Sequence, residues 1–81
     1  MTREEVIGKL VPVMEDVFDI DDLDYAETLT AGDIPEWDSL SHVRLMVAVE
    51  RAFAIRFTSS EIEDFKVLGD LVTAIAVKAA G

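Results

Sequence analysis

The chain has no cysteine and only one histidine, His42, among its 81 residues. It therefore has no disulfide framework and no thiolate of its own, and this composition argues against a metal site. Basic residues are also scarce, with seven Lys and Arg against 17 Asp and Glu, a formal charge of −10. Because phosphate recognition needs a basic patch, this balance argues against nucleic acid and membrane partners and favours basic protein surfaces.

Long apolar runs are missing as well. No stretch approaches the roughly 20 residues of a membrane-spanning helix, and Met1 to Glu5 carries acids where a signal peptide has a positive segment. We therefore expect a cytoplasmic protein. A chain of this length makes a single domain, residues 1–81, whose thin core leaves little room for a deep active site. These features argue against an enzyme and favour a monomeric module that acts through a partner.

Apolar residues recur at helical spacing in several segments, and no segment alternates like a strand. The first helical segment is Thr2 to Phe18. It opens with Thr2 and Glu5 at the spacing of a capping box, and Pro12 should kink it. Its buried face is predicted to comprise Val6, Leu10, Val13, Val17 and Phe18.

Three further segments complete the prediction. Ser39 to Phe53 is the second helix, Thr58 to Phe65 contains a short third helix, and the last helix opens at Gly69 or Asp70. The fold class is therefore all-α. We expect a four-helix bundle of three longer helices and a short third one, with a long loop between the first two.

The long loop, residues 19–37, is rich in aspartate but does not have the pattern of a calcium site. An EF-hand loop needs glycine at its sixth position, where counting from Asp19 gives Asp24. We therefore predict a solvated acidic loop. Apolar side chains along it are expected to fasten it across the domain: Leu23, Tyr25, Leu29, Ile34 and Trp37.

The second helix has two apolar stripes. At about 100° per residue, one stripe forms the core face, comprising Leu45, Met46, Val49 and Phe53. The other lies nearly opposite. A helix in so small a domain is not expected to be buried on both sides, so we predict an exposed docking patch for a partner. The alternative is that the loop or another helix covers it. The predicted docking residues are the stripe itself and its charged flanks: Leu40, Val43, Arg44, Val47, Glu50 and Arg51.

Ser39 stands at the start of this helix, between Asp38 and Leu40. The first backbone N–H groups of a helix lack internal partners and the macrodipole is positive there, so this end suits a phosphate ester on Ser39. The alternative is an ordinary capping serine. His42 shares a face with Ser39, but no third group or oxyanion hole accompanies the pair. We therefore expect no catalytic role and a His42 side chain partly packed under the loop.

The segment Glu36 to Val43, Glu-Trp-Asp-Ser-Leu-Ser-His-Val, together with Leu45 to Phe53, resembles the attachment region of acyl carrier proteins. The resemblance extends over nearly the whole chain, including the helix count, the loop length and the closing segment Phe65 to Leu71. It implies a phosphopantetheine-binding carrier domain. A phosphopantetheinyl transferase would move 4′-phosphopantetheine from coenzyme A to Ser39, and the thiol of the arm would hold an acyl or aminoacyl group as a thioester.

The resemblance also assigns roles to the neighbours of Ser39. Asp38 and Leu40 would complete the recognition motif of the transferase, and Val43 and Val47 match helix positions that touch partner enzymes. The partners implied are enzymes that load or use acyl groups in fatty acid or polyketide biosynthesis.

One departure from the family pattern concerns charge. Carriers of fatty acid synthesis usually have a strongly acidic second helix, whereas Ser41, Arg44 and Arg51 occupy such positions here. We therefore predict a specialised stand-alone carrier that serves a dedicated loading enzyme. Two alternatives stay open: an aminoacyl carrier of the peptidyl or D-alanyl type loaded by an adenylating enzyme, and an unmodified helical interaction module.

Overall fold

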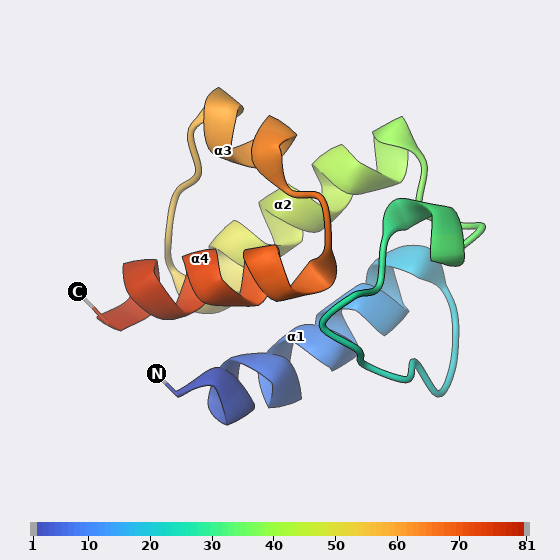
Figure 1. Cartoon of the computed structure of the whole chain (residues 1–81), viewed down its shortest axis with the longest axis horizontal. Coiled ribbons are helices and arrows are strands. Elements are labelled where there is room, and N and C mark those ends of the chain that lie inside the picture. The colour runs from blue at the N-terminus through green and yellow to red at the C-terminus, as the bar shows by residue number, and fades with distance from the viewer. Residues whose placement is uncertain (1, 81) are drawn as a thin grey trace.

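The computed structural model describes residues 2–80. Over this range the chain forms four α-helices and one 3-10 turn, and no strand (Figure 1). The predicted all-α bundle, with three longer helices and a short third one, is confirmed. The elements in chain order are α1 (Arg3–Phe18), η1 (Ala31–Asp33), α2 (Ser39–Phe53), α3 (Ser59–Asp64) and α4 (Leu68–Ala80).

Side-chain caps set the helix starts. In α1 the predicted capping box is present: the backbone N–H of Glu5 donates to Thr2 Oγ1 at 3.2 Å, and the N–H of Thr2 donates to Glu5 Oε1 at 2.9 Å. Thr58 and Glu61 form the same box at the start of α3. Because each box pairs two donors that the helix itself leaves free, these boundaries follow from local sequence. The helix α1 continues through Pro12 without a break.

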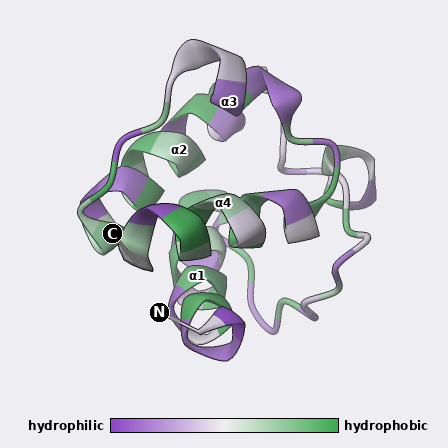
Figure 2. Cartoon of the chain, turned by 60° about the vertical axis from the view of Figure 1, so that its left-hand side comes forward, coloured by the Kyte–Doolittle hydropathy of each residue, from purple (hydrophilic) through white to green (hydrophobic). Residues whose placement is uncertain are grey.

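The core lies where α1, α2 and α4 meet, and α3 stands at the edge of the bundle (Figure 1). Figure 2 shows hydrophobic and hydrophilic positions alternating along the three long helices, while α3 is mainly hydrophilic. The predicted core face of α2 is confirmed, since all four of its residues are buried. The buried residues are Val6, Leu10, Met14, Phe18, Ile34, Leu45, Met46, Val49, Phe53, Ile55, Leu68, Leu71, Val72 and Ile75.

Two details of the sequence prediction were wrong. Val13 and Val17 are only partly buried, and Met14 takes the central place in α1. The buried face of α1 follows the strict i, i+4 ridge from Val6 to Phe18, so Val13 and Val17 fall on its flank. The last helix begins at Leu68, before the predicted Gly69 or Asp70.

The long loop explains the early start of α4. The N–H of Leu68 donates to the carbonyl of Leu29 at 2.7 Å, and the N–H of Gly69 donates to the carbonyl of Glu27 at 2.9 Å. These loop carbonyls therefore satisfy N–H groups that α4 itself leaves free. The prediction that apolar side chains fasten the loop is confirmed, because Ile34 is buried and the others pack partly buried against the core: Leu23, Tyr25, Leu29 and Trp37.

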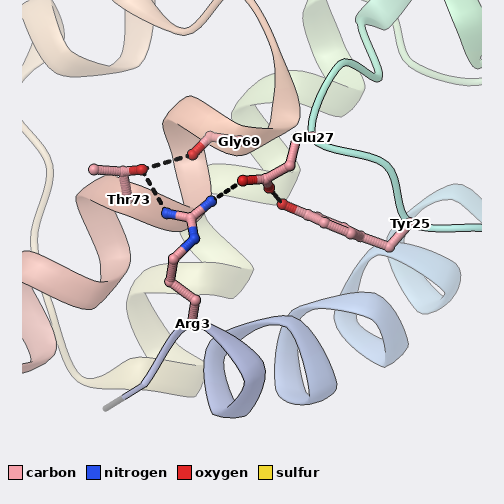
Figure 3. A network of polar contacts seen from close by, with 5 residues as sticks. All are labelled: Arg3, Tyr25, Glu27, Gly69 and Thr73. Atoms are coloured by element: carbon pink, nitrogen blue, oxygen red, sulfur yellow. Dashed lines mark hydrogen bonds and ion pairs between the residues drawn. The ribbon is translucent and has the colours of Figure 1, made fainter.

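A polar network ties the same loop to both terminal helices (Figure 3). The guanidinium of Arg3 donates to Thr73 Oγ1 at 2.7 Å and forms an ion pair with Glu27, which also accepts the hydroxyl of Tyr25. Thr73 in turn donates to the carbonyl of Gly69 at 3.0 Å. The loop is thereby joined to α1 and α4 at Tyr25 and Glu27.

Within residues 2–80, no group of three or more His, Asp or Glu side chains is arranged to hold a metal ion. No helix in this range is long and apolar enough to span a bilayer.

The contact between Gly69 and the loop leads to a testable prediction. A Cβ atom at Gly69 would lie 3.0 Å from the carbonyl oxygen of Glu27, so in Gly69→Ala the loop must move by a few tenths of an ångström. Because the two hydrogen bonds to α4 resist this shift, we expect a net loss of about 1 kcal/mol of unfolding free energy, the cost of overpacking less the gain from alanine in a helix. Gly8→Ala is the matched control: a Cβ at Gly8 meets nothing within 4 Å, and alanine should stabilise the exposed helix by about 0.5–1 kcal/mol. Urea denaturation of both variants measures the difference, and an unchanged Gly69→Ala variant would contradict the tight contact.

Candidate functional site

Ser39 is the first residue of α2, and its side chain is exposed. The helix starts here because Asp38 caps it: the backbone of Asp38 is extended, and its carboxylate accepts the N–H of Ser41 at 2.8 Å. This hydrogen bond, together with one from the Ser41 side chain, lowers the pKa of the Asp38 carboxyl below its ordinary value. The cap thus presents the Ser39 hydroxyl outward at a defined position.

The capping carboxylate changes one expectation. The sequence suggests that the free N–H groups at the start of α2 would hold a phosphate, but Asp38 already provides an anion at this helix end. Among the described residues, the Ser39 hydroxyl has no hydrogen-bond partner. The Asp38 carboxylate therefore occupies one of the N–H groups, that of Ser41, which the sequence alone would leave for a phosphate on Ser39.

Beside Ser39 lies a cavity of about 700 Å³ between α2, α3 and the segment leading into α4. Asp38, Glu63 and Lys66 contribute polar groups to its lining, and Lys66 is the basic residue among them. The remaining wall is largely apolar, a surface suited to a hydrocarbon chain. Its apolar residues are Ala31, Trp37, Val43, Met46, Ile62, Phe65, Val67 and Leu71.

His42 joins three elements at this cavity. The indole N–H of Trp37 donates to His42 Nδ1 at 3.1 Å, and His42 Nε2 lies 3.0 Å from the carbonyl oxygen of Ile62 in α3. A neutral imidazole protonated on Nε2 satisfies both contacts. The Trp37 ring packs between His42 and Phe18, with centroid distances of 6.0 and 5.5 Å. The prediction that His42 packs partly under the loop is therefore confirmed.

The same two contacts explain why Ser39 and His42 do not form a nucleophile and base. A general base needs a free lone pair directed at the hydroxyl. The Nδ1 lone pair of His42 already accepts the Trp37 indole N–H, and Nε2 points to Ile62. The chain therefore offers no base to Ser39 from this ring.

The second apolar stripe of α2 is exposed. The exposed fractions are 64% for Leu40, 56% for Val43 and 42% for Val47, so the alternative that the loop or another helix covers this stripe is wrong. Arg44 and Arg51 are exposed beside it, as predicted. Glu50 is half-buried, and its carboxylate accepts the backbone N–H of Phe57 at 2.8 Å.

Sequence reasoning predicted Ser39 as the site and the exposed apolar stripe, but it missed the groups that approach them from elsewhere in the chain. The bond from His42 to Ile62 joins residues 20 positions apart, and Phe65 and Lys66 reach the cavity from the segment after α3. A pattern within one helix carries no signal for such contacts.

The bridge made by His42 gives a prediction. In His42→Leu, both the Trp37 N–H and the Ile62 carbonyl lose a partner in a partly buried site, which should lower the unfolding free energy by about 2 kcal/mol. Trp37→Phe keeps the aromatic ring but removes one donor and should cost about 1 kcal/mol. A double-mutant cycle by urea denaturation should give a positive coupling between the two positions. Additive losses would contradict the bridge.

The cap at Asp38 gives a prediction on pH. Because folding lowers the pKa of this carboxyl, its stabilising contribution is complete above the unfolded pKa of about 4 and is lost as pH falls through the folded pKa. Asp38→Ala should therefore be less stable than the native chain at neutral pH, and the gap should shrink in acid. Asp24→Ala, an exposed loop acid, is the control and should show no such trend. Thermal denaturation of both variants and of the native chain between neutral and acidic pH measures these differences. A stability difference between Asp38→Ala and the native chain that does not change with pH would contradict the role of the Asp38 carboxylate as the cap.

Comparison with known proteins agrees with this geometry. Residues 36–75 match the family described as phosphopantetheine attachment site. The chain is 32% identical over 76 residues to an acyl carrier protein of Acidothermus cellulolyticus, covering 94% of this chain and 90% of that protein. It is 27% identical over 75 residues to the meromycolate extension acyl carrier protein of Mycobacterium leprae, covering 93% of this chain and 65% of that protein.

A solved structure gives the same result. The solution NMR structure of holo acyl carrier protein from Geobacter metallireducens aligns with a TM-score of 0.87 at 36% identity, over 93% of this chain and 86% of that one. With the match at the attachment segment, this indicates a carrier that bears covalent 4′-phosphopantetheine, not a catalyst. Such carriers are modified by a phosphopantetheinyl transferase and act with biosynthetic enzymes. The chain belongs to the acyl carrier protein family.

Proposed function

We propose that Ser39 carries the 4′-phosphopantetheine group. The observation behind this proposal is an exposed, unbonded hydroxyl at the first residue of α2, inside the segment that matches the attachment family. It stands between Asp38 and Leu40 and borders the largely apolar cavity. Lys66 on the cavity wall offers a positive charge to the phosphodiester.

The other serines of the chain fit this role less well. All four serines lie within the matched segment, so the family match alone does not select one. Ser41 is partly buried in the first turn of α2, and its N–H is already bound to Asp38. Ser59 and Ser60 are exposed at the start of the six-residue α3, away from the Asp-Ser-Leu motif.

The attachment reaction needs a base from the transferase. In the proposed step, Ser39 Oγ bonds to the phosphorus that bears the pantetheine of coenzyme A. The bond from this phosphorus to the bridging pyrophosphate oxygen breaks, and 3′,5′-adenosine bisphosphate leaves. The serine proton must go to a base, and both nitrogens of His42 are engaged. Ser39 therefore acts as a substrate presented on the helix, and the enzyme supplies the catalytic groups.

The attached group supplies a terminal thiol, which this cysteine-free chain lacks, for acyl groups held as thioesters. The chain supplies the anchor at Ser39, an apolar cavity beside it and a surface for each enzyme that receives the arm.

We propose that this surface is the exposed stripe of α2 together with its flanks. The stripe begins next to Ser39 and continues along one side of α2 through Leu40, Val43 and Val47. An enzyme bound to this stripe would therefore have the arm on Ser39 close to its active site. Exposed apolar side chains rimmed by charge are typical of contact surfaces. Brief docking needs few contacts, which suits a patch of this size. The charged flanks in the proposed surface are Arg44, Glu50 and Arg51.

The first experiment is intact-mass spectrometry after incubation with coenzyme A and a broad-specificity phosphopantetheinyl transferase. We expect one 4′-phosphopantetheine group on the native chain and on Ser41→Ala, and none on Ser39→Ala. Circular dichroism of each variant checks that the helices are intact. Addition to Ser39→Ala, or no addition to the folded native chain, would overturn the assignment of Ser39.

A further inference from the structure

Charge is unevenly distributed over this acidic chain, and α2 lies in its basic part. Residues 39–60 hold three arginines and one glutamate, a net charge of +2, whereas the rest of the chain holds four basic and sixteen acidic residues, a net charge of −12. The three arginines are Arg44, Arg51 and Arg56, and all are exposed. The proposed docking surface thus has the opposite sign to the chain as a whole.

The single acid of this segment does not neutralise the arginines. The carboxylate of Glu50 is directed at the connector after α2, where it accepts the N–H of Phe57 at 2.8 Å. Within residues 2–80, no carboxylate lies within ion-pair distance of Arg44, Arg51 or Arg56. The ion pairs of this range lie elsewhere and use Arg3 and Lys78. Three guanidinium groups are therefore available to a partner.

The arginines lie beside the apolar stripe and continue past its end. Arg44 follows Val43, and a hollow of about 510 Å³ at the far end of α2 is lined by Arg51 and Arg56 together with Val47 and Glu50. At about 1.5 Å per residue, Arg44 is about 7.5 Å and Arg51 about 18 Å along the helix axis from Ser39. Glu36 and Asp38 are exposed at the Ser39 end. Along this segment of the chain the exposed charges therefore change from acidic, at Glu36 and Asp38 before α2, to basic from Arg44 onward.

We propose that the partner is an enzyme with carboxylates around an apolar docking patch, placed to meet Arg44, Arg51 and Arg56. This inference rests on the proposed docking function of α2 and adds the chemistry of the partner. The Debye length is about 8 Å at physiological ionic strength, whereas the molecule measures 33 × 25 × 21 Å. Acids on the far side are therefore largely screened from the contact, and the local arginines determine which surface fits.

The change of sign along α2 also fixes the direction of docking. An acidic partner surface gains contacts with the arginines only when its active-site entrance faces the Ser39 end. In the reversed orientation its carboxylates would face Asp38 and Glu36, and like charges in contact are unfavourable. The arginines therefore select both the partner and the orientation in which the arm enters.

Two designed helical peptides test this proposal. Both have the same leucine stripe, flanked by glutamates in one and by lysines in the other, and each is titrated into ¹⁵N-labelled holo-protein. We expect the Glu-flanked peptide to shift amide resonances of Leu40 to Arg51, and the Lys-flanked peptide to shift those of the acidic loop. Reversing all three arginines to glutamate should weaken binding of the Glu-flanked peptide about tenfold, as expected for three exposed charge contacts.

A matched pair of variants controls for net charge. Arg44→Glu and Lys9→Glu change the charge of the chain equally, but Lys9 lies on α1 beside Phe53. Only Arg44→Glu should weaken binding of the Glu-flanked peptide to the protein. The proposal is overturned if the two variants behave alike, if the Lys-flanked peptide shifts α2 equally, or if neither peptide shifts it. Intact mass of the same samples separates the two proposals: a chain without the arm contradicts the attachment function, whereas a modified chain without charge preference contradicts only the acidic partner.

Discussion

Two backbone hydrogen bonds between the loop and α4 hold this structure in its functional arrangement. The carbonyls of Glu27 and Leu29 accept the N–H groups of Gly69 and Leu68 at the start of α4. Because Gly69 has no side chain, the loop backbone at Glu27 can approach the helix this closely. The loop leads directly into Asp38 and Ser39, so these bonds help to set where α2 starts. Arg3, which contacts both Glu27 and Thr73, adds a side-chain link from this loop to α1 and α4.

The position of α3 depends on polar contacts more than on the core. A small core holds three helices together but leaves α3 at the edge with no fully buried residue. Polar contacts from His42 to Ile62 and from Lys78 to Glu61 help to keep α3 in place beside the cavity. Because His42 is used in this way, its ring is not available as a base to the Ser39 hydroxyl. The chemistry is done by the enzymes that the carrier meets.

Much of the fold was predictable because its signals are local. The capping box of Thr2 and Glu5 specifies the start of α1, and the spacing along α2 separates a core face from an exposed one. The proposal of Ser39 as the attachment residue also came from its place at a helix start and from the residues around it. The contacts that sequence reasoning missed are non-local: α4 starts at Leu68 because of carbonyls some 40 positions earlier in the chain. The hydrogen bond from the Ser41 N–H to the Asp38 carboxylate at the start of α2 was also not predicted from the sequence and was found only in the structure.

The only tryptophan of the chain stands two residues before Ser39, between the rings of Phe18 and His42. Indole emission depends on the polarity and hydrogen bonding around the ring, and here both are set by α1, the loop and α2 together. The protein therefore contains an intrinsic optical probe two residues from the proposed attachment residue. Arrival of the arm, loading of a cargo or docking of an enzyme can be followed at this position by intrinsic fluorescence, without a label that would disturb so small a surface.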